Sequence, residues 1–166
     1  MAYSSSKGLI SIATAYNNGS YTWHKLDSFM QPSGIDITPD QMQDMDSTVN
    51  SKGDLIRNVL SVSRTKCECA TRNLSYDEKK TLLGYIASAI NLNDADFHGR
   101  TSNQIKCNKA QRCCVIRYYD DYTDSYKKVH MYIPDITFKY GGTYERKPRY
   151  LSISIHMVAY EKAINE

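Results

Sequence analysis

Long apolar runs are absent from this sequence. No stretch of about 18 consecutive apolar residues occurs, and the first residues lack the charged region and apolar core of a signal peptide. We therefore expect neither a membrane span nor secretion through a signal peptide. The sequence also lacks a Gly-rich nucleotide loop, an internal repeat and a low-complexity tract. The sequence has no strong excess of positive or negative charge, because the formal net charge is only +3 and the basic residues are spread along the chain.

Metal-binding and catalytic patterns are missing as well. No two histidines have metal-ligand spacing; they are His24, His98, His130 and His156. The five cysteines match neither a disulfide framework nor the zinc spacing C-x2-4-C; they are Cys67, Cys69, Cys107, Cys113 and Cys114. A nucleophilic pair of Cys113 or Cys114 with His130 stays open as an enzymatic alternative. We therefore expect that the protein is not an enzyme and that it has no catalytic, cofactor or metal site and no small-molecule substrate.

Tyrosine dominates the aromatic residues, with 14 Tyr against three Phe and one Trp. Its large ring and polar tip suit both sheets and protein interfaces. Alternating apolar and polar residues predict strands over 59–71 and in three runs from 112 to 161, the last a single half-buried strand over 149–160. Pro39 favours an edge strand or an ordered loop before the polar turn at 47–53.

One helix is predicted between these strands. Ser75 and Glu78 form a capping box, and apolar residues follow at spacings of three and four, which predicts a helix over 76–90 lying across a sheet. Residues 1–22 are rich in Ser, Asn, Tyr and Gly and predict an N-terminal arm, while 91–111 form a polar connection. The sequence therefore predicts a mainly β protein of the α+β class.

The order of several short motifs carries a family resemblance. They are Trp23-His24-Lys25-Leu26, Gln43-Asp44-Met45-Asp46-Ser47, Arg64-Thr65-Lys66, Leu74-Ser75-Tyr76-Asp77-Glu78, Met131-Tyr132-Ile133-Pro134-Asp135 and Tyr150-Leu151-Ser152-Ile153-Ser154-Ile155. In this order they resemble the small tail proteins of long-tailed bacteriophages and prophages, a family with a tail-tube-like fold. The resemblance covers residues 23–161, leaving 1–22 as the arm and 162–166 as a C-terminal tail.

The resemblance implies an antiparallel β-sandwich or half-barrel with one flanking helix. It also implies a virion component, present in the host cytoplasm before assembly, that forms a ring of the tail tube or of the tube-to-tip region. Its partners would be copies of itself, in a hexameric ring stacked or capped by other tail proteins, with DNA passing through the channel. We expect the subunit interface to involve the arm and a tyrosine-rich hairpin, through Leu9, Ile10, Tyr118, Tyr119, Tyr122, Tyr126 and Tyr132.

A nucleic-acid-binding module is the alternative from another class. The same hairpin interleaves tyrosines with Arg117, Lys127 and Lys128, a combination typical of stacking platforms for single strands. Three aspartates at the hairpin tip, Asp120, Asp121 and Asp124, would repel phosphates. They are better explained by turn chemistry than by a calcium site. The other basic enrichment, at 139–149, is interpreted as a solvated strand face or loop.

Overall fold

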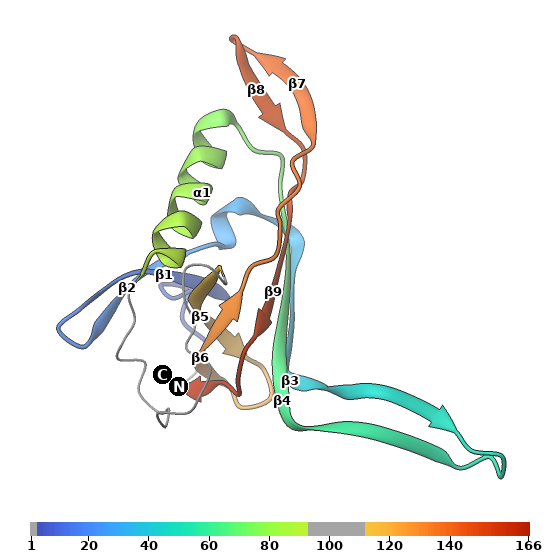
Figure 1. Cartoon of the computed structure of the whole chain (residues 1–166). Coiled ribbons are helices and arrows are strands. Elements are labelled where there is room, and N and C mark those ends of the chain that lie inside the picture. Colours follow the sequence, from blue (N-terminus) through green and yellow to red (C-terminus); the bar gives the residue numbers. More distant parts are fainter. Residues whose placement is uncertain (1–2, 93–111) are drawn as a thin grey trace.

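A computed structural model describes residues 3–92 and 112–166 (Figure 1). Its elements in chain order are β1 (Ile10–Asn17), β2 (Ser20–Lys25), the short 3-10 helix η1 (Asp27–Phe29), β3 (Met30–Val49), β4 (Leu55–Thr71), α1 (Tyr76–Ile90), β5 (Cys113–Asp120), β6 (Ser125–Tyr132), β7 (Tyr140–Tyr144), β8 (Lys147–Tyr150), β9 (Ser154–Ala159) and β10 (Ile164–Asn165). Most of the predicted 91–111 connection, with His98 and Cys107, lies outside the described residues.

The main sheet is antiparallel and open. Its strands run in the order β2-β1-β5-β6-β9-β4-β3, and β10 pairs with β6 beside this path. Strands β7 and β8 form a separate two-stranded sheet. The mainly β, α+β prediction with one flanking helix is therefore confirmed. The sheet does not close into a barrel, because β2 and β3 stand at its two edges.

Alternating side chains of the central strands supply the core. On β9, Ile155, Met157 and Ala159 are at most 1% exposed, while the intervening His156 faces outward. Helix α1 contacts β1, β5 and β8 and buries Leu82, Ile86 and Ala89. The predicted apolar stripe therefore packs onto the sheet. None of the described helices is long and apolar enough to cross a membrane.

The start of α1 follows its capping-box sequence. The Glu78 amide donates to Ser75 Oγ at 3.3 Å, and the Ser75 amide donates back to Glu78 Oε2 at 2.9 Å. Arg72 Nη2 adds an ion pair to Glu78 Oε1 at 2.5 Å. The hydrogen bond from Arg72, together with those from Ser75, lowers the pKa of Glu78 to about 2.

Acidification should remove this contribution to stability. The pKa of Glu78 falls from 4.5 to about 2 on folding, so its stabilisation is complete above pH 4.5 and is lost as the pH falls towards 2. We expect Glu78→Gln to lower the urea midpoint at neutral pH, with the difference from the wild type shrinking as the pH decreases. Denaturation curves across this range provide the measurement. A difference that stays constant with pH would contradict the assignment.

Strand β3 is an edge strand, which is one of the two alternatives that Pro39 favours. Pro32 and Pro39 both lie within it, and an edge strand can lose an amide donor on its open side. The partly buried side chains of Ile35 and Ile37 pack against the core. Strand β4 begins four residues earlier than the predicted 59–71 run, and together the two strands form a long hairpin that leaves the body of the molecule (Figure 1).

The predicted strand over 149–160 is interrupted. Residues 151–153 separate β8 from β9, because β8 pairs with β7 whereas β9 pairs with β4 and β6. Ile153 still bonds to Thr71, whose side-chain oxygen accepts from the Ile153 amide at 2.9 Å. Within the break, Ile153 is still buried, as the alternating pattern predicts. Leu151, two residues earlier on the same predicted face, is 42% exposed. A change of partner strand therefore splits what the sequence pattern joins.

Both ends of the chain pack against the sheet in the structure. Within the predicted arm, β1 pairs with β2 and with β5, and Ile10 and Ile12 are fully buried. Within the predicted tail, β10 pairs with Lys127 and Lys128 of β6. These segments therefore contribute strands to the main sheet.

Candidate assembly surfaces

Within residues 3–92 and 112–166, no other strand pairs with the outer part of the β3–β4 hairpin. Strand β4 pairs with β9 only over Lys66–Ala70, so from Leu55 to Arg64 it pairs with β3 alone. We call this part, residues 41–49 and 55–64, the ribbon. At about 3.3 Å per residue it reaches roughly 30 Å beyond the sheet. Figure 1 shows it projecting at an angle to the inner part of the same hairpin.

The end of the ribbon exposes apolar side chains. Val49, Leu55 and Ile56, which we call the ribbon tip, are 65%, 62% and 53% exposed. The turn between them is ordered by Asn50, whose side-chain oxygen accepts from the amides of Lys52 and Asp54 at 2.9 Å each. An apolar tip on a fixed turn is a surface suited to insertion into another protein.

A buried polar cluster holds the base of the ribbon. Thr65 Oγ1 lies 2.8 Å from the Tyr118 hydroxyl and accepts from the Asp40 amide at 3.1 Å. Asp40 has a φ of +43°, a left-handed conformation that is uncommon outside glycine. Burial raises the pKa of Tyr118, so its hydroxyl stays neutral. The bend in the hairpin thus coincides with side chains that fix the backbone of Asp40.

Lys127 extends this cluster towards the tip of the β5–β6 hairpin. Its amine forms an ion pair with the buried Asp120 and lies 3.6 Å from Asp40 Oδ2, too long for a hydrogen bond. Burial raises the pKa of Asp120, but hydrogen bonds from Lys127, the Tyr122 amide and Thr123 outweigh it, so the pKa falls below its usual value. The Asp120 carboxylate therefore stabilises the turn, and its hydrogen-bonding capacity is met by these neighbours.

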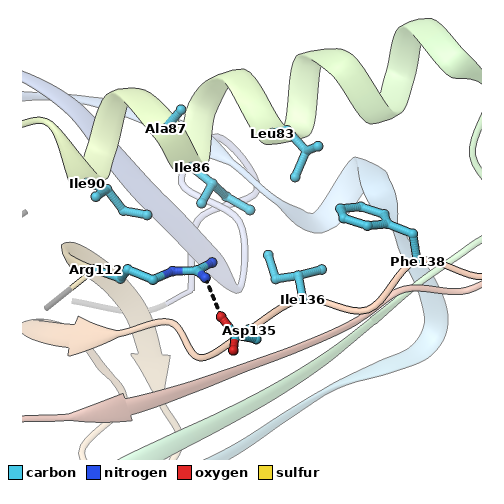
Figure 2. Close-up of a pocket in the computed structure, with 8 residues that line it drawn as sticks. All are labelled: Leu83, Ile86, Ala87, Ile90, Arg112, Asp135, Ile136 and Phe138. Carbon is cyan, nitrogen blue, oxygen red and sulfur yellow. Dashed lines mark hydrogen bonds and ion pairs between the residues drawn. The ribbon is translucent and has the colours of Figure 1, made fainter. Parts of the chain in front are cut away.

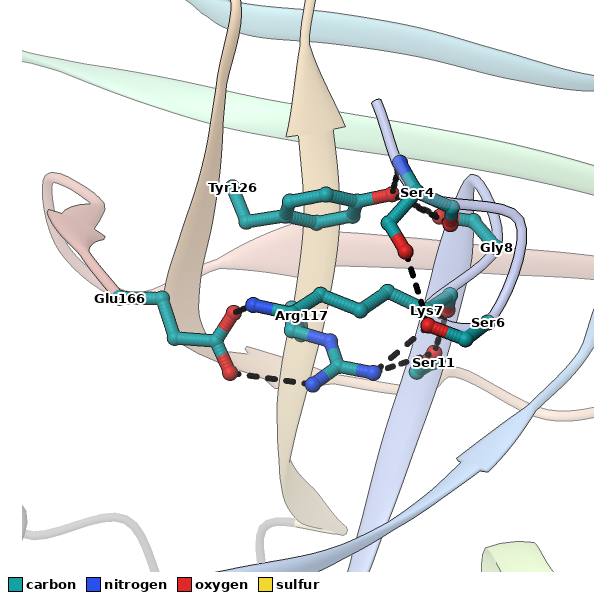
Figure 3. Close-up of polar contacts among 8 residues, drawn as sticks. All are labelled: Ser4, Ser6, Lys7, Gly8, Ser11, Arg117, Tyr126 and Glu166. Atoms are coloured by element: carbon teal, nitrogen blue, oxygen red, sulfur yellow. Dashed lines mark hydrogen bonds and ion pairs between the residues drawn. The ribbon is translucent and has the colours of Figure 1, made fainter. Parts of the chain in front are cut away.

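The two ends of the chain meet at one ion-pair network (Figure 3). Glu166 accepts from Lys7 Nζ at 2.6 Å and from Arg117 Nη1 at 3.0 Å. Arg117 is 6% exposed, and its guanidinium lies over the Trp23 ring at 4.6 Å. We call Lys7, Arg117 and Glu166 the terminal clamp. Burial raises the pKa of Glu166, but these two cations outweigh that effect and lower it.

Tyr126 ties the N-terminal segment to the same strand pair. Its hydroxyl accepts from the Ser4 amide at 3.0 Å and donates to the Gly8 carbonyl at 2.9 Å (Figure 3). The Lys7 amine lies over its ring at 4.9 Å. The segment before β1 is therefore fastened to β5 and β6 by side chains far away in sequence.

The seven predicted interface residues differ in how far their side chains are exposed. Ile10, Tyr118 and Tyr126 are at most 4% exposed, so their side chains pack inside the subunit. Tyr119 is partly buried and packs edge-on against Tyr3 and Tyr126. Accessible surface comes from Leu9, Tyr122 and Tyr132, which are 38%, 75% and 36% exposed. Burial also removes Tyr118 and Tyr126 from any stacking platform for nucleic acid.

The ribbon tip and the β7–β8 hairpin are surfaces that the sequence patterns did not identify. All five residues of β7 are exposed, including Tyr140 and Tyr144. The available signals were the apolar residues on either side of the polar turn at 47–53 and the basic enrichment at 139–149. Both were interpreted as ordinary turn or solvated segments.

The cysteines do not form the nucleophilic pair left open by the sequence. Burial raises the pKa of Cys114 to about 12, and its thiol donates to the Met131 carbonyl at 3.5 Å. Cys113 is disulfide-bonded, so it offers no free thiol. The Nδ1 atom of His130 lies 3.0 Å from Glu161 Oε1. Within residues 3–92 and 112–166, no group of His, Cys, Asp and Glu is arranged to hold a metal ion.

A groove of 510 Å³ lies between α1 and residues 135–138 (Figure 2). Its walls are mostly apolar and are formed by Leu83, Ile86, Ala87, Ile90, Ile136 and Phe138. The polar groups at its side are Arg112 and Asp135, which bind each other at 2.9 Å. Since these two charges satisfy one another, the groove presents no convergent reactive groups.

The fold and surfaces define a mainly β protein with an open sheet and projecting hairpins. The chain belongs to a family of unknown function (DUF6711), whose model matches residues 18–160. No curated protein sequence matches it.

Three solved structures are similar in fold. One comes from the tail of an empty GTA particle with C6 symmetry, with a TM-score of 0.44, 13% identity and 99% of each chain covered. The other two come from the phage p2 baseplate in its activated conformation, with Sr and with Ca. Each has a TM-score of 0.45, with 14% and 15% identity, over 93% of this chain. The present chain spans 44% of the length of those baseplate chains.

Proposed function

We propose that this protein is a non-enzymatic structural subunit of a bacteriophage tail that assembles with copies of itself. The ordered motifs between residues 23 and 161 support the tail assignment through their resemblance to small tail proteins. The open antiparallel sheet and its projecting hairpins support assembly, because unpaired strand edges and exposed hairpins are completed by neighbouring chains.

The ribbon is the observation that carries this proposal. A two-stranded hairpin without a third strand or a packed face is marginally stable in water. This one spans 41–49 and 55–64, pairs with no other strand of the described residues and ends in exposed Val49, Leu55 and Ile56. A neighbouring copy would bury this tip and pair with the free edge of β3, and would thereby stabilise the ribbon.

The finer assignment follows from the same resemblance. We place the protein in a hexameric ring of the tail tube or of the tube-to-tip region, stacked or capped by other tail proteins, with DNA passing through the channel. The virion tail is then its final location and the host cytoplasm its site of synthesis. Leu9, Tyr119, Tyr122 and Tyr132 remain candidate interface residues, because their side chains are at least partly accessible.

Replacing the ribbon tip tests this proposal. We expect Val49→Thr, Leu55→Thr and Ile56→Thr, combined, to weaken self-association by about two orders of magnitude, if each buried anchor contributes about 1 kcal/mol. Stability of the subunit should hardly change, since all three side chains are exposed in it. Sedimentation velocity gives the association constant, and thermal unfolding gives the stability.

The matched control keeps the tip apolar, with Val49→Ile, Leu55→Met and Ile56→Val combined. It should assemble as the wild type does. If the threonine variant assembled equally well, the tip would not be an assembly contact. If the wild type itself stayed monomeric, the proposed function would fail.

A further inference from the structure

The second projecting hairpin differs from the ribbon in its charge. Residues 139–149, which we call the basic hairpin, contain four basic residues and one acidic residue, Glu145. The resulting excess of three positive charges equals the formal net charge of the whole chain, +3. The rest of the chain is therefore neutral in sum. This segment concentrates the positive charge at one end of the molecule (Figure 1).

The tip of the basic hairpin is strained. Glu145 and Arg146 form its two-residue turn, with φ values of +49° and +62°. Turns of this kind favour Asn-Gly, because both central residues must adopt the left-handed conformation. Two long charged side chains at these positions point to a role other than turn formation.

The cations of this hairpin are not equally available. The Arg149 guanidinium already lies over the Tyr144 ring at 4.5 Å, and Lys147 binds Asp77 of α1 at 3.0 Å. Arg146, at the turn itself, makes no ion pair with any residue in the described ranges. It is therefore the charge that the tip presents to a partner.

A complementary surface lies at the opposite end of the body. Residues 121–124, which we call the acidic turn, are all exposed and carry Asp121, Tyr122 and Asp124. Strand β6 begins just after this turn, and the chain leaving its far end leads to β7. Figure 1 accordingly shows the β7–β8 hairpin and the start of β6 at opposite ends of the molecule.

We infer that the basic hairpin of one copy binds the acidic turn of the next copy, head to tail. The Asp121 carboxylate supplies the counter-charge for Arg146, and the 75% exposed Tyr122 ring offers a face on which a guanidinium stacks. Such a contact joins two different surfaces of identical chains, so it propagates as a stack. The inference rests on the proposed function and adds the contact between successive layers.

A charge swap tests the pairing. We expect Arg146→Glu and Asp121→Arg each to weaken stacking by about tenfold at low salt, and the double variant to restore it. Added salt should weaken the wild-type contact, since exposed charges are screened. Sedimentation velocity reports the association, and electron microscopy of stained particles distinguishes single rings from stacks. Lys80→Glu, an exposed charge reversal on α1, is the control and should stack normally.

Several results would overturn the inference. If both single variants stacked as the wild type does, or if the double variant stayed as weak as the singles, these two residues would not pair. If rings formed and neither substitution changed their stacking, this inference would fail while the proposed function would stand. If the wild type stayed monomeric, the proposed function itself would be wrong. Fluorescence anisotropy with a labelled oligothymidine tests whether the hairpin binds single-stranded nucleic acid. If Arg146→Glu abolished this binding and left the association of copies unchanged, the basic hairpin would be a nucleic-acid site and not a contact between copies.

Discussion

Deleting residues 41–62 and joining Asp40 to Ser63 through an Asn-Gly turn should abolish ring formation while the protein remains folded. The deleted part contains the ribbon tip and almost all of the ribbon, and apart from β3 and β4 themselves it pairs with none of the strands that the structure describes. The hydrogen bonds that hold the base, between Asp40, Thr65 and Tyr118, remain. Since the core is untouched, the melting temperature of the variant should stay close to that of the wild type.

A second variant serves as the control for this deletion. Replacing only residues 50–54 with Asn-Gly changes the turn but keeps the paired strands and the apolar tip. It should retain most of the association. A deletion variant that still formed rings would show that the ring contact lies elsewhere, and one that failed to fold would show that the ribbon belongs to the folding core.

Replacing Arg117 with Met should destabilise the protein by about 3 kcal/mol, because the charge-assisted hydrogen bonds of the buried guanidinium to Glu166 and Ser11 are lost, although Lys7 still pairs with Glu166. Arg117 is 6% exposed and binds Glu166 at 3.0 Å, while its Nη2 also donates to Ser11 Oγ at 3.3 Å. For a chain of this size, such a loss lowers the melting temperature by roughly 6–12 °C. Thermal and urea unfolding provide the measurement.

Lys7→Met is the comparison within the same clamp. The side chain of Lys7 is 30% exposed, so its ion pair with Glu166 contributes at most about 1 kcal/mol. The Arg117 variant should therefore be clearly less stable than the Lys7 variant. Equal losses of unfolding free energy in the two variants would show that the clamp depends on Glu166 alone. If neither variant lost stability, the terminal clamp would not stabilise the fold.

Local patterns in the sequence determined much of this fold in advance. The helix spans 76–90 as predicted, because the Ser75–Glu78 capping box and the apolar stripe are both short-range signals. The hairpin of β5 and β6 and the edge position of β3 were also recognisable, from alternation and from proline.

Features that depend on distant residues were not predictable in this way. Alternation identifies a face but not its partner, so it could not show that the strand over 149–160 breaks between two different sheets. Nor could it show that Tyr118 and Tyr126 turn inward while Tyr122 stays on the surface. The terminal clamp joins Lys7 to Glu166 across almost the whole chain, and no local pattern encodes such a contact.

Self-assembly of the purified wild-type chain can be measured by sedimentation velocity over a wide concentration range. We expect reversible growth from a monomer to a closed ring, followed by larger stacks at low salt. A single monomeric species at every concentration and every salt level would contradict the proposed function.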